Sequence, residues 1–407
     1  MPPPAVRRLA AALSILGLGL TVAACGADGG SAGVTEDTIS LGATNTLAGA
    51  GSGVCRPLTE GASAWFDHVN AAGGVRERQI EFQVLDDGYA PERAIGNVRS
   101  LLGEPVLAMV GACGTSTAAA IADPLDQAGV PYLFPYVGLA SVVEPPKRSV
   151  FSLVPLYERQ VRALVPHGFD ERGAGSVFVV ANQWAGYEDS IRIAEEQTIA
   201  LGGRFLGSQA APLGTNDYTP IALQIKQQRP DFVVVNMGGT DAAKFVNALV
   251  DQGALPAKAM LGVSAMVGRE FLSSYNPAAE DKVIAASVIQ LPPEPGSECA
   301  TALDTAGLEA EPMMLLGCAV GQATTTALEQ APELTRDGII AALEGWDGAQ
   351  VAPGVLPPVS FAPDDHLGLE SVYLVRPQGR EFHTVAECPI EAAGGACEPV
   401  GDGEPDQ

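Results

Sequence analysis

Short apolar runs alternate with longer segments of helical periodicity along most of this chain. The runs at 39–44 and 80–85 suit strands, while the segment 57–72 between them repeats apolar residues at helical spacing until Gly73 and Gly74 end it. Further helices are expected at 91–102 and 116–128, and further strands at 106–110 and 130–134. Repeated strand–helix–strand units build a parallel sheet with helices on both faces, so the pattern predicts an α/β fold.

A second set of similar units follows. Its expected strands are 176–180, 204–208, 232–235, 260–262 and 283–289, and its expected helices are 190–200, 218–228 and 241–252. The proline-rich stretches 140–150 and 291–296 are expected to be extended, non-helical connectors, and helices at 312–330 and 335–344 and a strand at 371–375 come after them. Two similar lobes joined by several extended crossings predict a hinge, with a cleft that closes on a small molecule.

Residues 1–24 predict an export signal. Arg7 and Arg8 precede the apolar run 9–22, which is too short to span a membrane and leads through small residues to Cys25. The ending has the look of a bacterial lipobox, in which Cys25 would be lipidated and become the new N-terminus. Residues 25–35 would then form a flexible tether between the lipid and the folded part.

Cysteine usage agrees with export. Six cysteines besides Cys25 make an even number, and an oxidising compartment favours bridges between them. Spacing suggests the pairs Cys299–Cys318 and Cys388–Cys397, which leaves Cys55 with Cys113, although six cysteines allow other connectivities. A zinc site is not expected, because the chain has no close Cys-x-x-Cys pair and only four scattered histidines.

The chain is strongly acidic. It carries 48 Asp and Glu against 23 Lys and Arg, for a formal net charge of −25. Nucleic acid is not expected as a partner, because the long-range field of such a chain repels polyanions.

The stretch VGACGTSTAAA at 110–120 is a glycine-bearing turn that opens an alanine-rich helix. It lacks the lysine of a phosphate-binding P-loop, the full Gly-x-Gly-x-x-Gly pattern of a dinucleotide fingerprint and the second glycine of a serine-nucleophile elbow, so neither a cofactor nor catalysis is expected. The helix N-terminus with Thr115, Ser116 and Thr117 suits one negative group, most simply a carboxylate. In the alternative interpretation, Ser116 or Thr117 only caps the helix.

Paired carboxylates do not predict a hydrolase centre either. Asp86 and Asp87 end a strand just before Gly88, and Asp364 and Asp365 fall in a loop, so turn formation explains both pairs.

Four blocks of the chain carry a family resemblance. They are ISLGATNTLAGAGSG at 39–53, GASAWFDHVNAAGGVRERQIEFQVLDDGYAPERAIGNVRSLL at 61–102, VGACGTSTAAAIADPLDQAGVPYLFP at 110–135, and NDYTPIALQIKQQRPDFVVVNMGGTDAAKFVNALVDQG at 216–253. In order and spacing, they resemble the substrate-binding lipoproteins of branched-chain amino acid-type ABC transporters, the type I periplasmic binding proteins.

The resemblance implies two Rossmann-like lobes, three crossovers, and a ligand clamped between the lobes without chemistry on it. The first lobe is expected at 36–153 plus 290–361 and the second at 154–289 plus 362–386. Residues 387–407 are acidic and low in aromatics, so they are expected to form a C-terminal tail. The resemblance also implies two partners, a membrane permease and its cytoplasmic ATPases.

In the first lobe, the resemblance gives Thr115 the role of a serine that contacts the ligand carboxylate, with Ser116 and Thr117 adjacent. After the next strand the family offers hydroxyl-bearing contacts. Here Tyr136 can contact the ligand, whereas Gly138 has no hydroxyl to offer. Near the first strand, Thr44, Asn45 and Arg56 are further cleft candidates, with loop structure as the alternative.

In the second lobe, Trp184 and Tyr187 flank Ala185, which aligns with a family aromatic residue; each either closes over the ligand or packs in the core or rim. Asn236 lies at a strand end where the family has further contacts. Ser264 stands where the family has the carboxylate that pairs with the ligand's ammonium group. A buried ammonium without that partner keeps its desolvation cost, so a standard aliphatic amino acid is a poor fit.

These observations predict a monomeric, extracytoplasmic solute-binding lipoprotein, held at the outer face of the cell membrane, that delivers an amino acid, amide or small carboxylate to a permease. A ligand-binding sensor subunit that acts through a membrane partner is the alternative. An exported enzyme is disfavoured, because no nucleophile–base or metal constellation is evident.

The lipobox-like ending predicts that Cys25 carries the membrane anchor. Stable anchoring requires more than one acyl chain, so a multiply acylated Cys25 is expected, and Cys25→Ala should release the protein from the membrane fraction. Cell fractionation followed by mass analysis of the N-terminal peptide measures this. Retention of the variant in the membrane fraction would contradict the prediction.

Overall fold

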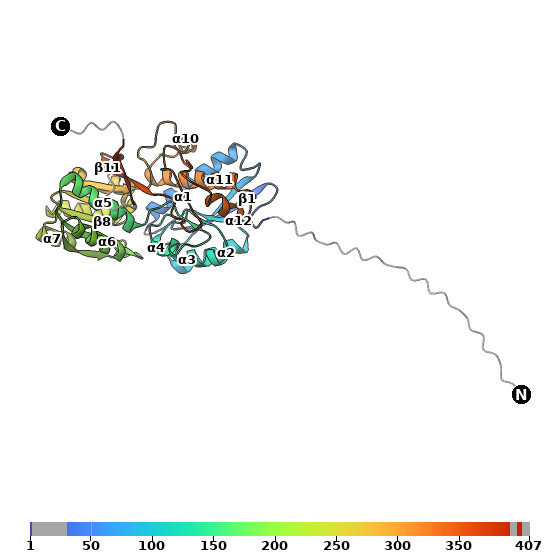
Figure 1. The fold of residues 1–407 in the computed structure, drawn as a ribbon, viewed down its shortest axis with the longest axis horizontal. Helices are drawn as coiled ribbons and strands as arrows, with labels where there is room; N and C mark the ends of the chain where they lie inside the picture. Colours follow the sequence, from blue (N-terminus) through green and yellow to red (C-terminus); the bar gives the residue numbers. More distant parts are fainter. Residues whose placement is uncertain (2–30, 50, 391–396, 401–407) are drawn as a thin grey trace. The chain divides into compact units, whose positions relative to one another are not determined.

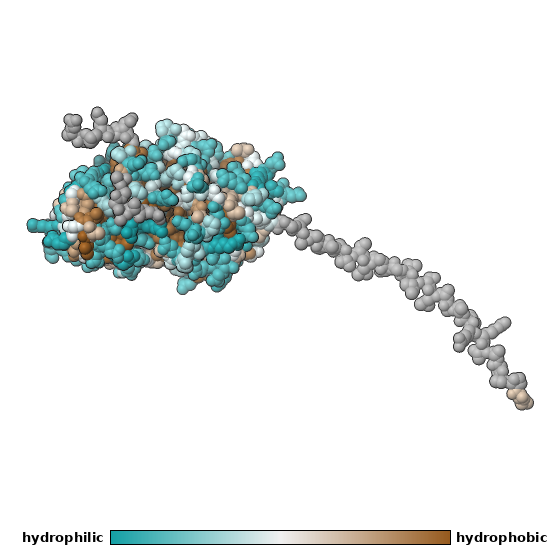
Figure 2. Space-filling model, in the orientation of Figure 1, coloured by the Kyte–Doolittle hydropathy of each residue, from teal (hydrophilic) through white to brown (hydrophobic). Residues whose placement is uncertain are grey.

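The computed structural model describes residues 1, 31–49, 51–390 and 397–400 (Figure 1). Residues 2–24 of the predicted export signal, residues 25–30 of the predicted tether with Cys25, and residues 391–396 and 401–407 of the predicted tail lie outside this part. Among the described residues, no helix combines the length and apolar character needed to cross a membrane. Hydrophilic residues cover most of the face of the folded part that Figure 2 shows.

The first lobe is built on a five-stranded sheet in which all paired strands are parallel, with the order β2-β1-β3-β4-β5. The strands are β1 (Thr38–Asn45), β2 (Gln79–Asp86), β3 (Ala108–Val110), β4 (Tyr132–Leu133) and β5 (Val150–Phe151). The central strand β3 is fully buried, as expected for a parallel sheet with helices on both faces.

Helices cover both faces of this sheet. They are α1 (Ser52–Ala71), α2 (Pro91–Gly103), α3 (Thr115–Gln127), α4 (Ala140–Val143), α10 (Glu298–Thr305), α11 (Pro312–Gln330) and α12 (Arg336–Leu343). α1 and α11 lie side by side (Figure 1), and their backbones approach so closely that a Cβ at Gly61 would overlap the Met314 carbonyl and a Cβ at Gly317 would overlap the Leu58 carbonyl. The C-terminal helices thus complete the N-terminal lobe.

The second lobe contains an eight-stranded sheet with the order β13-β12-β11-β10-β9-β8-β6-β7. Its strands are β6 (Ser176–Asn182), β7 (Arg204–Ala211), β8 (Phe232–Asn236), β9 (Ala259–Gly262), β10 (Val283–Ser287), β11 (Ser371–Gln378), β12 (Glu381–Pro389) and β13 (Glu398–Pro399). The strands from β7 to β10 pair in parallel, whereas β11, β12 and β13 add an antiparallel edge.

The helices of the second lobe are α5 (Tyr157–Arg172), α6 (Tyr187–Ala200), α7 (Thr219–Gln228), α8 (Gly239–Gln252) and α9 (Arg269–Ser274), with the 3₁₀ turns η1 (Ser264–Met266) and η2 (Pro277–Lys282). One apolar cluster continues through both lobes, from Leu58 and Phe134 in the first to Phe245 and Val283 in the second. Each lobe also has its own cluster on the other face of its sheet.

Three chain crossings connect the lobes, and backbone hydrogen bonds hold each of them. The first and third meet where the Ser152 backbone N–H donates to the His366 carbonyl (2.9 Å) and the Gly368 N–H donates to the Ser152 carbonyl (2.8 Å). In the second, the Gln290 N–H donates to the Val355 carbonyl (2.9 Å). The predicted α/β fold with two lobes and a three-crossover hinge is confirmed, with an antiparallel edge added to the second sheet.

Several elements differ from the sequence expectation. Residues 140–143 form the short helix α4 inside a stretch expected to be non-helical, because the helix ends before Pro145 and Pro146. α5 was not predicted, since Pro166 lies inside it and tertiary packing overrides the local preference. Residues 387–389, assigned to the tail, lie in β12, where the buried Cys388 packs against the second lobe.

The three disulfides suggested by the cysteine spacing are confirmed. The Cα–Cα distances are 5.4 Å for Cys55–Cys113, 5.6 Å for Cys299–Cys318 and 4.2 Å for Cys388–Cys397. The first bridge ties α1 to the end of β3, the second ties α10 to α11, and the third joins β12 to the segment before β13.

Removing each bridge by paired Cys→Ala substitution should lower the free energy of unfolding, typically by about 2–4 kcal/mol. The loops closed span 58, 19 and 9 residues, so the Cys55–Cys113 pair should cost most and the Cys388–Cys397 pair least. Urea denaturation of the three double variants measures the order. Equal costs for all three would contradict the loop-entropy argument.

Candidate ligand-binding site

The site begins at the carboxyl edge of the first sheet. Isolated bridges extend the parallel pairing beyond the strands, from Asn45 to Cys113 and from Cys113 to Tyr136. The Asn45 side chain fixes this edge, because its Oδ1 accepts from the Cys113 N–H (2.7 Å) and its Nδ2 donates to the Thr59 hydroxyl of α1 (2.8 Å). Ligands of open α/β sheets bind outside such strand ends.

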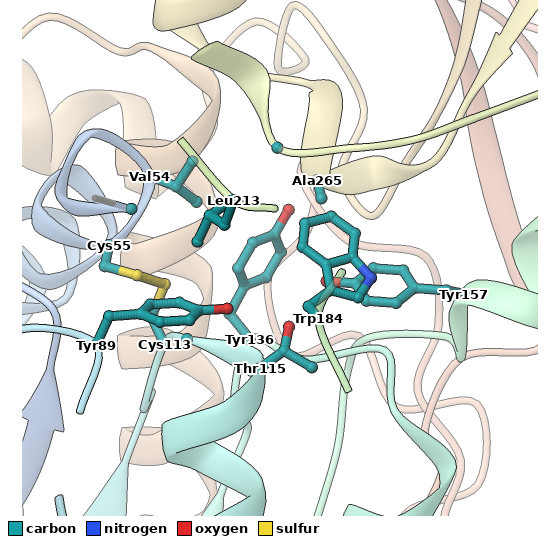
Figure 3. A pocket seen from close by; sticks show the side chains of 13 residues that line it. Val54, Cys55, Tyr89, Cys113, Thr115, Tyr136, Tyr157, Trp184, Leu213 and Ala265 are labelled. Atoms are coloured by element: carbon teal, nitrogen blue, oxygen red, sulfur yellow. A yellow bond between two sulfur atoms is a disulfide. The ribbon is translucent and has the colours of Figure 1, made fainter. Parts of the chain in front are cut away.

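A small cavity of about 60 Å³, here called the inner chamber, lies at this edge. Both lobes line it (Figure 3). The first lobe and the start of α5 contribute Gly51, Val54, Cys55, Tyr89, Cys113, Gly114, Thr115, Tyr136 and Tyr157, and the second lobe contributes Trp184, Leu213, Gly238 and Ala265. Four of the lining side chains are aromatic, and none of these thirteen described residues is charged.

The aromatic side chains hold one another in place. Tyr157 and Trp184 stack with ring centroids 5.4 Å apart, which joins the first crossing to the second lobe. The Tyr136 hydroxyl donates to the Ser264 carbonyl across the lobes (3.1 Å). The Tyr157–Trp184 stack lies within the apolar cluster of the second lobe, whereas the Tyr136–Ser264 contact crosses between the lobes and depends on their closed arrangement.

Thr115 offers a hydroxyl to the chamber at the first residue of α3. Burial raises the pKa of Tyr157 to about 12, and hydrogen bonding with the Thr115 side chain opposes the rise. Burial also raises the pKa of Tyr136 well above its ordinary value. Both phenols are therefore neutral at physiological pH, so the chamber offers neutral hydroxyls.

The Cys55–Cys113 disulfide forms part of the wall beside Tyr89 (Figure 3). The next residue, Gly114, has φ +111°, a conformation that L residues rarely adopt, and a Cβ there would press against Thr117. The glycine thus lets the chain turn sharply from the bridge into α3.

A second cavity of about 210 Å³, the outer chamber, adjoins the inner one and shares Gly51, Val54, Leu213 and Gly238 with it. It is more polar, since Asp241, Lys244 and Glu270 line it. Asp241 already has partners, because its Oδ2 accepts from Asn182 Nδ2 (2.8 Å) and from the Gly214 N–H (2.7 Å).

Glu270 connects the lobes at the outer chamber. It lies on α9 of the second lobe and reaches the first turn of α1, so closely that a Cβ at Gly53 would overlap its carboxylate. The first turn of α1 contains no acidic residue, and its N-cap Gly51 has no capping side chain. Glu270 therefore supplies the negative charge that the N-terminus of α1 favours, from the opposite lobe.

The structure places the sequence-predicted residues in two groups. Thr115, Tyr136 and Trp184 line the inner chamber, together with the bridge Cys55–Cys113. Ser116, Thr117, Gly138, Tyr187, Asn236 and Ser264 are not among its lining residues.

The residues of the second group have identifiable structural contacts. The Thr117 hydroxyl donates to the Gly114 carbonyl (3.0 Å). A Cβ at Gly138 would lie 2.8 Å from the Tyr157 ring, so this glycine makes room for that side chain. Asn236 donates to the Ser190 hydroxyl (3.0 Å), and Tyr187 begins α6 and packs against the apolar cluster of the second lobe.

Ser264 lies directly behind the chamber. Its N–H donates to Gln160 Oε1 (2.7 Å), its carbonyl accepts from Tyr136, and its buried hydroxyl has no hydrogen-bond partner. The neighbouring Ala265, not Ser264, reaches the lining.

Sequence reasoning missed Tyr89 and Tyr157. Tyr157 opens α5, a helix that the interior Pro166 hid, and Tyr89 follows the Asp86–Asp87–Gly88 turn, which drew attention only as a turn. The one available signal is that Tyr89, like Thr115, follows a strand of the first sheet, so the two belong at the same edge.

The other candidates near the first strand have structural roles. Asp87 is fully buried and accepts from the hydroxyls of Thr44 (3.2 Å) and Thr46 (2.8 Å), and burial raises its pKa. Asp86 accepts from the N–H groups of Leu47 and Gly88, which agrees with the predicted turn. Arg56 donates to the Leu47 carbonyl.

One group of potential metal ligands is found among the described residues, His167 with Cys388 and Cys397. The two cysteines are bonded to each other, so they offer no thiolate.

A chamber lined by two hinged lobes defines a ligand-binding protein that encloses a small molecule. The model of the periplasmic binding protein family matches residues 38–381, and the chain belongs to this family. The family comprises extracytoplasmic solute-binding proteins of ABC transporters, which bind small molecules. A sequence search of curated proteins finds no match to this chain.

Solved structures share the fold at low sequence identity. A fatty acid ABC transporter substrate-binding protein from Thermomonospora curvata is 19% identical with a TM-score of 0.79, over 89% of this chain and 95% of that one. A branched-chain amino acid ABC transporter protein from Thermus thermophilus with bound valine is 17% identical with a TM-score of 0.78, over 89% of this chain and 98% of that one. A solute-binding protein from R. palustris in complex with benzoate is 15% identical with a TM-score of 0.75, over 86% of this chain and 97% of that one.

The Glu270–Gly53 contact predicts a variant that opens the lobes. Gly53→Ala should displace the Glu270 carboxylate and weaken closure by about 0.3–1 kcal/mol, the range of a charge at a helix terminus. Small-angle X-ray scattering should then give a larger radius of gyration than for the wild type.

Gly96→Ala is the matched control, because that helical glycine has open space around its missing side chain. Since Gly53→Ala and Glu270→Ala remove the same contact, their combination should not add to the effect of either alone. Additive effects, or an unchanged radius of gyration for Gly53→Ala, would show that the contact does not hold the lobes.

Proposed function

We propose that this protein captures a small ligand with an apolar body between its lobes and delivers it to an ABC permease. The observation that supports this most is the inner chamber, where Tyr89, Tyr136, Tyr157 and Trp184 surround a space reached from both lobes. Aromatic and aliphatic walls with a few hydroxyls are typical of sites for small, largely apolar ligands.

The lining favours an amide or a small carboxylate over a standard amino acid. A buried ammonium group needs an anionic partner to offset its desolvation, and the described lining of the inner chamber offers no carboxylate. Ser264, the position where the family resemblance expects that carboxylate, lies behind Ala265. The acidic side chains of the outer chamber are engaged, Asp241 by Asn182 and Gly214 and Glu270 by Thr240.

The similar structures differ in the ligands that their titles name, a fatty acid, valine and benzoate. These molecules share a carboxylate and an apolar body. The shared fold thus supports a small organic solute as the cargo here, and the lining of this chain decides which kind.

We further propose that lipidated Cys25 holds the protein at the outer face of the membrane as a monomer. Export explains the three disulfides, which persist in an oxidising compartment. An anchored receptor keeps the captured ligand close to the permease.

Thermal-shift screening of amino acids, amides and small carboxylic acids tests the proposed function. A ligand that binds only the folded state raises the melting temperature by mass action, by about 2.7 kcal/mol of stabilisation at a hundred times its Kd. We expect shifts from apolar amides or acids and none from free aliphatic amino acids. Selective stabilisation by leucine or valine would contradict the proposed ligand class.

Trp184 should be necessary for binding. Because it stacks on Tyr157 and closes the chamber from the second lobe, Trp184→Phe should weaken the affinity for any ligand found in the screen by roughly tenfold, in line with the value of an aromatic contact. Isothermal calorimetry measures the change in affinity. If the ligand alters the tryptophan fluorescence of the wild type, the loss of that change in Trp184→Phe would show that Trp184 lies at the ligand.

Tyr187→Phe is the control, since Tyr187 lies on the same lobe but not in the chamber lining. Equal affinities of Trp184→Phe and wild type would place the ligand elsewhere.

A further inference from the structure

Tyr89 holds an unusual position in the inner chamber. It lies between β2 and α2 with φ +62°, in the left-handed region that a bulky residue rarely adopts. Its ring lies against two glycines, since a Cβ at Gly51 would be 3.3 Å from the ring and one at Gly114 would be 3.4 Å away. The strained backbone and the two missing side chains together direct this phenol into the chamber (Figure 3).

The Tyr89 hydroxyl lies on the side of the ring toward Thr115, the first residue of α3 (Figure 3). Burial raises the pKa of Tyr89, and hydrogen bonding from the side chains and backbone of Ser116 and Thr115 opposes the rise. The N-cap of α3 is Gly114, which has no capping side chain, so the first turn has free N–H donors. Tyr89, whose ring packs against the N-cap Gly114, thus covers the helix N-terminus that would otherwise attract a ligand anion.

We propose that Tyr89 makes the inner chamber selective for uncharged ligands, such as apolar primary amides and other neutral carbonyl compounds, over carboxylates. This inference rests on the proposed function and specifies its ligand class. The sequence predicts that a ligand carboxylate binds at Thr115–Thr117. The proposal replaces this carboxylate with a neutral carbonyl group of the ligand.

The selectivity follows from which atoms face the ligand. The Tyr89 ring packs against Gly114 at the start of α3, and Tyr89 lines the chamber beside Thr115, so the phenol offers its O–H to the ligand. A carbonyl oxygen of an amide accepts this proton and remains neutral. A carboxylate would lose much of its hydration on entry and would find neither the N–H groups of α3 nor a cationic side chain among the residues that line the chamber.

A merely structural tyrosine would fill space without distinguishing the two ligand types. The test is therefore the affinity ratio of a matched amide and acid, with benzamide and benzoate as probes and the full chain as receptor. For the wild type we expect benzamide to bind at least tenfold more tightly than benzoate. Isothermal calorimetry measures both affinities.

Two substitutions separate the donor from the bulk of the side chain. Tyr89→Phe keeps the ring and removes the O–H, and should weaken benzamide roughly tenfold, the value of one hydrogen bond. Tyr89→Ala uncovers the N-terminus of α3 and should shift the benzoate-to-benzamide ratio at least tenfold toward benzoate. Tyr187→Phe should leave the ratio unchanged.

A separate arm does not depend on either aromatic probe. Acetate, compared with chloride at equal ionic strength, should raise the melting temperature of Tyr89→Ala and not that of the wild type, because only the variant exposes the anion position. If Tyr89→Ala folds poorly, the Tyr89→Phe comparison with benzamide still decides.

The outcomes distinguish this inference from the proposed function. Wild-type preference for benzoate, or an unchanged ratio in Tyr89→Ala, overturns the role of Tyr89 and leaves a small-ligand receptor intact. If neither aromatic probe binds, the acetate arm decides the role of Tyr89: a shift in the variant alone supports it, and equal shifts overturn it. The proposed function itself fails only in the broader screen of the wild type.

Discussion

The pairing of three backbone segments at the carboxyl edge of the first sheet is the constraint on which the rest of the site depends. Asn45, Cys113 and Tyr136 continue the parallel ladder beyond the regular strands. Asn45 and the Cys55–Cys113 bridge then fix the starts of α1 and α3 against this edge. Because the two helix N-termini are held there, the side chains that follow them face one small space.

The site depends more on ring packing and neutral hydroxyls than on charge. Four aromatic residues line the inner chamber, and the charged residues Asp241, Lys244 and Glu270 line only the outer chamber. In so apolar a space, an unpaired ion would keep its full desolvation cost, whereas a neutral polar group needs only one or two hydrogen bonds. Small changes in which hydroxyl faces the ligand therefore have large effects on ligand class.

Closure of the lobes is supported by few direct contacts. Tyr136 reaches the Ser264 carbonyl, and Glu270 reaches the first turn of α1. A ligand favours this arrangement only by its differential affinity for it, to which these contacts add. The crossings at Ser152 and Gln290 are held by backbone hydrogen bonds at the hinge.

The sequence by itself determined the α/β class, the two lobes and part of the chamber, and it suggested the three disulfide pairs that the structure contains. Hydrophobic periodicity is a local property of the chain, and Thr115 and Tyr136 follow strands, so their place at a sheet edge was predictable from the order of the elements. The helix α5 was missed because Pro166 and Gly168 obscure its periodicity, and burial against the sheet stabilises it despite them.

Only the tertiary structure decided which side chains meet in the chamber. Tyr89 lies there because two glycines distant in sequence leave room for its ring, and Ser264 is excluded because its turn presents Ala265 instead. Such choices depend on sub-ångström fits between segments far apart in the chain, and no local pattern encodes them. The sequence therefore fixes the edge at which the ligand binds, and packing between the lobes determines which chemical groups the ligand meets.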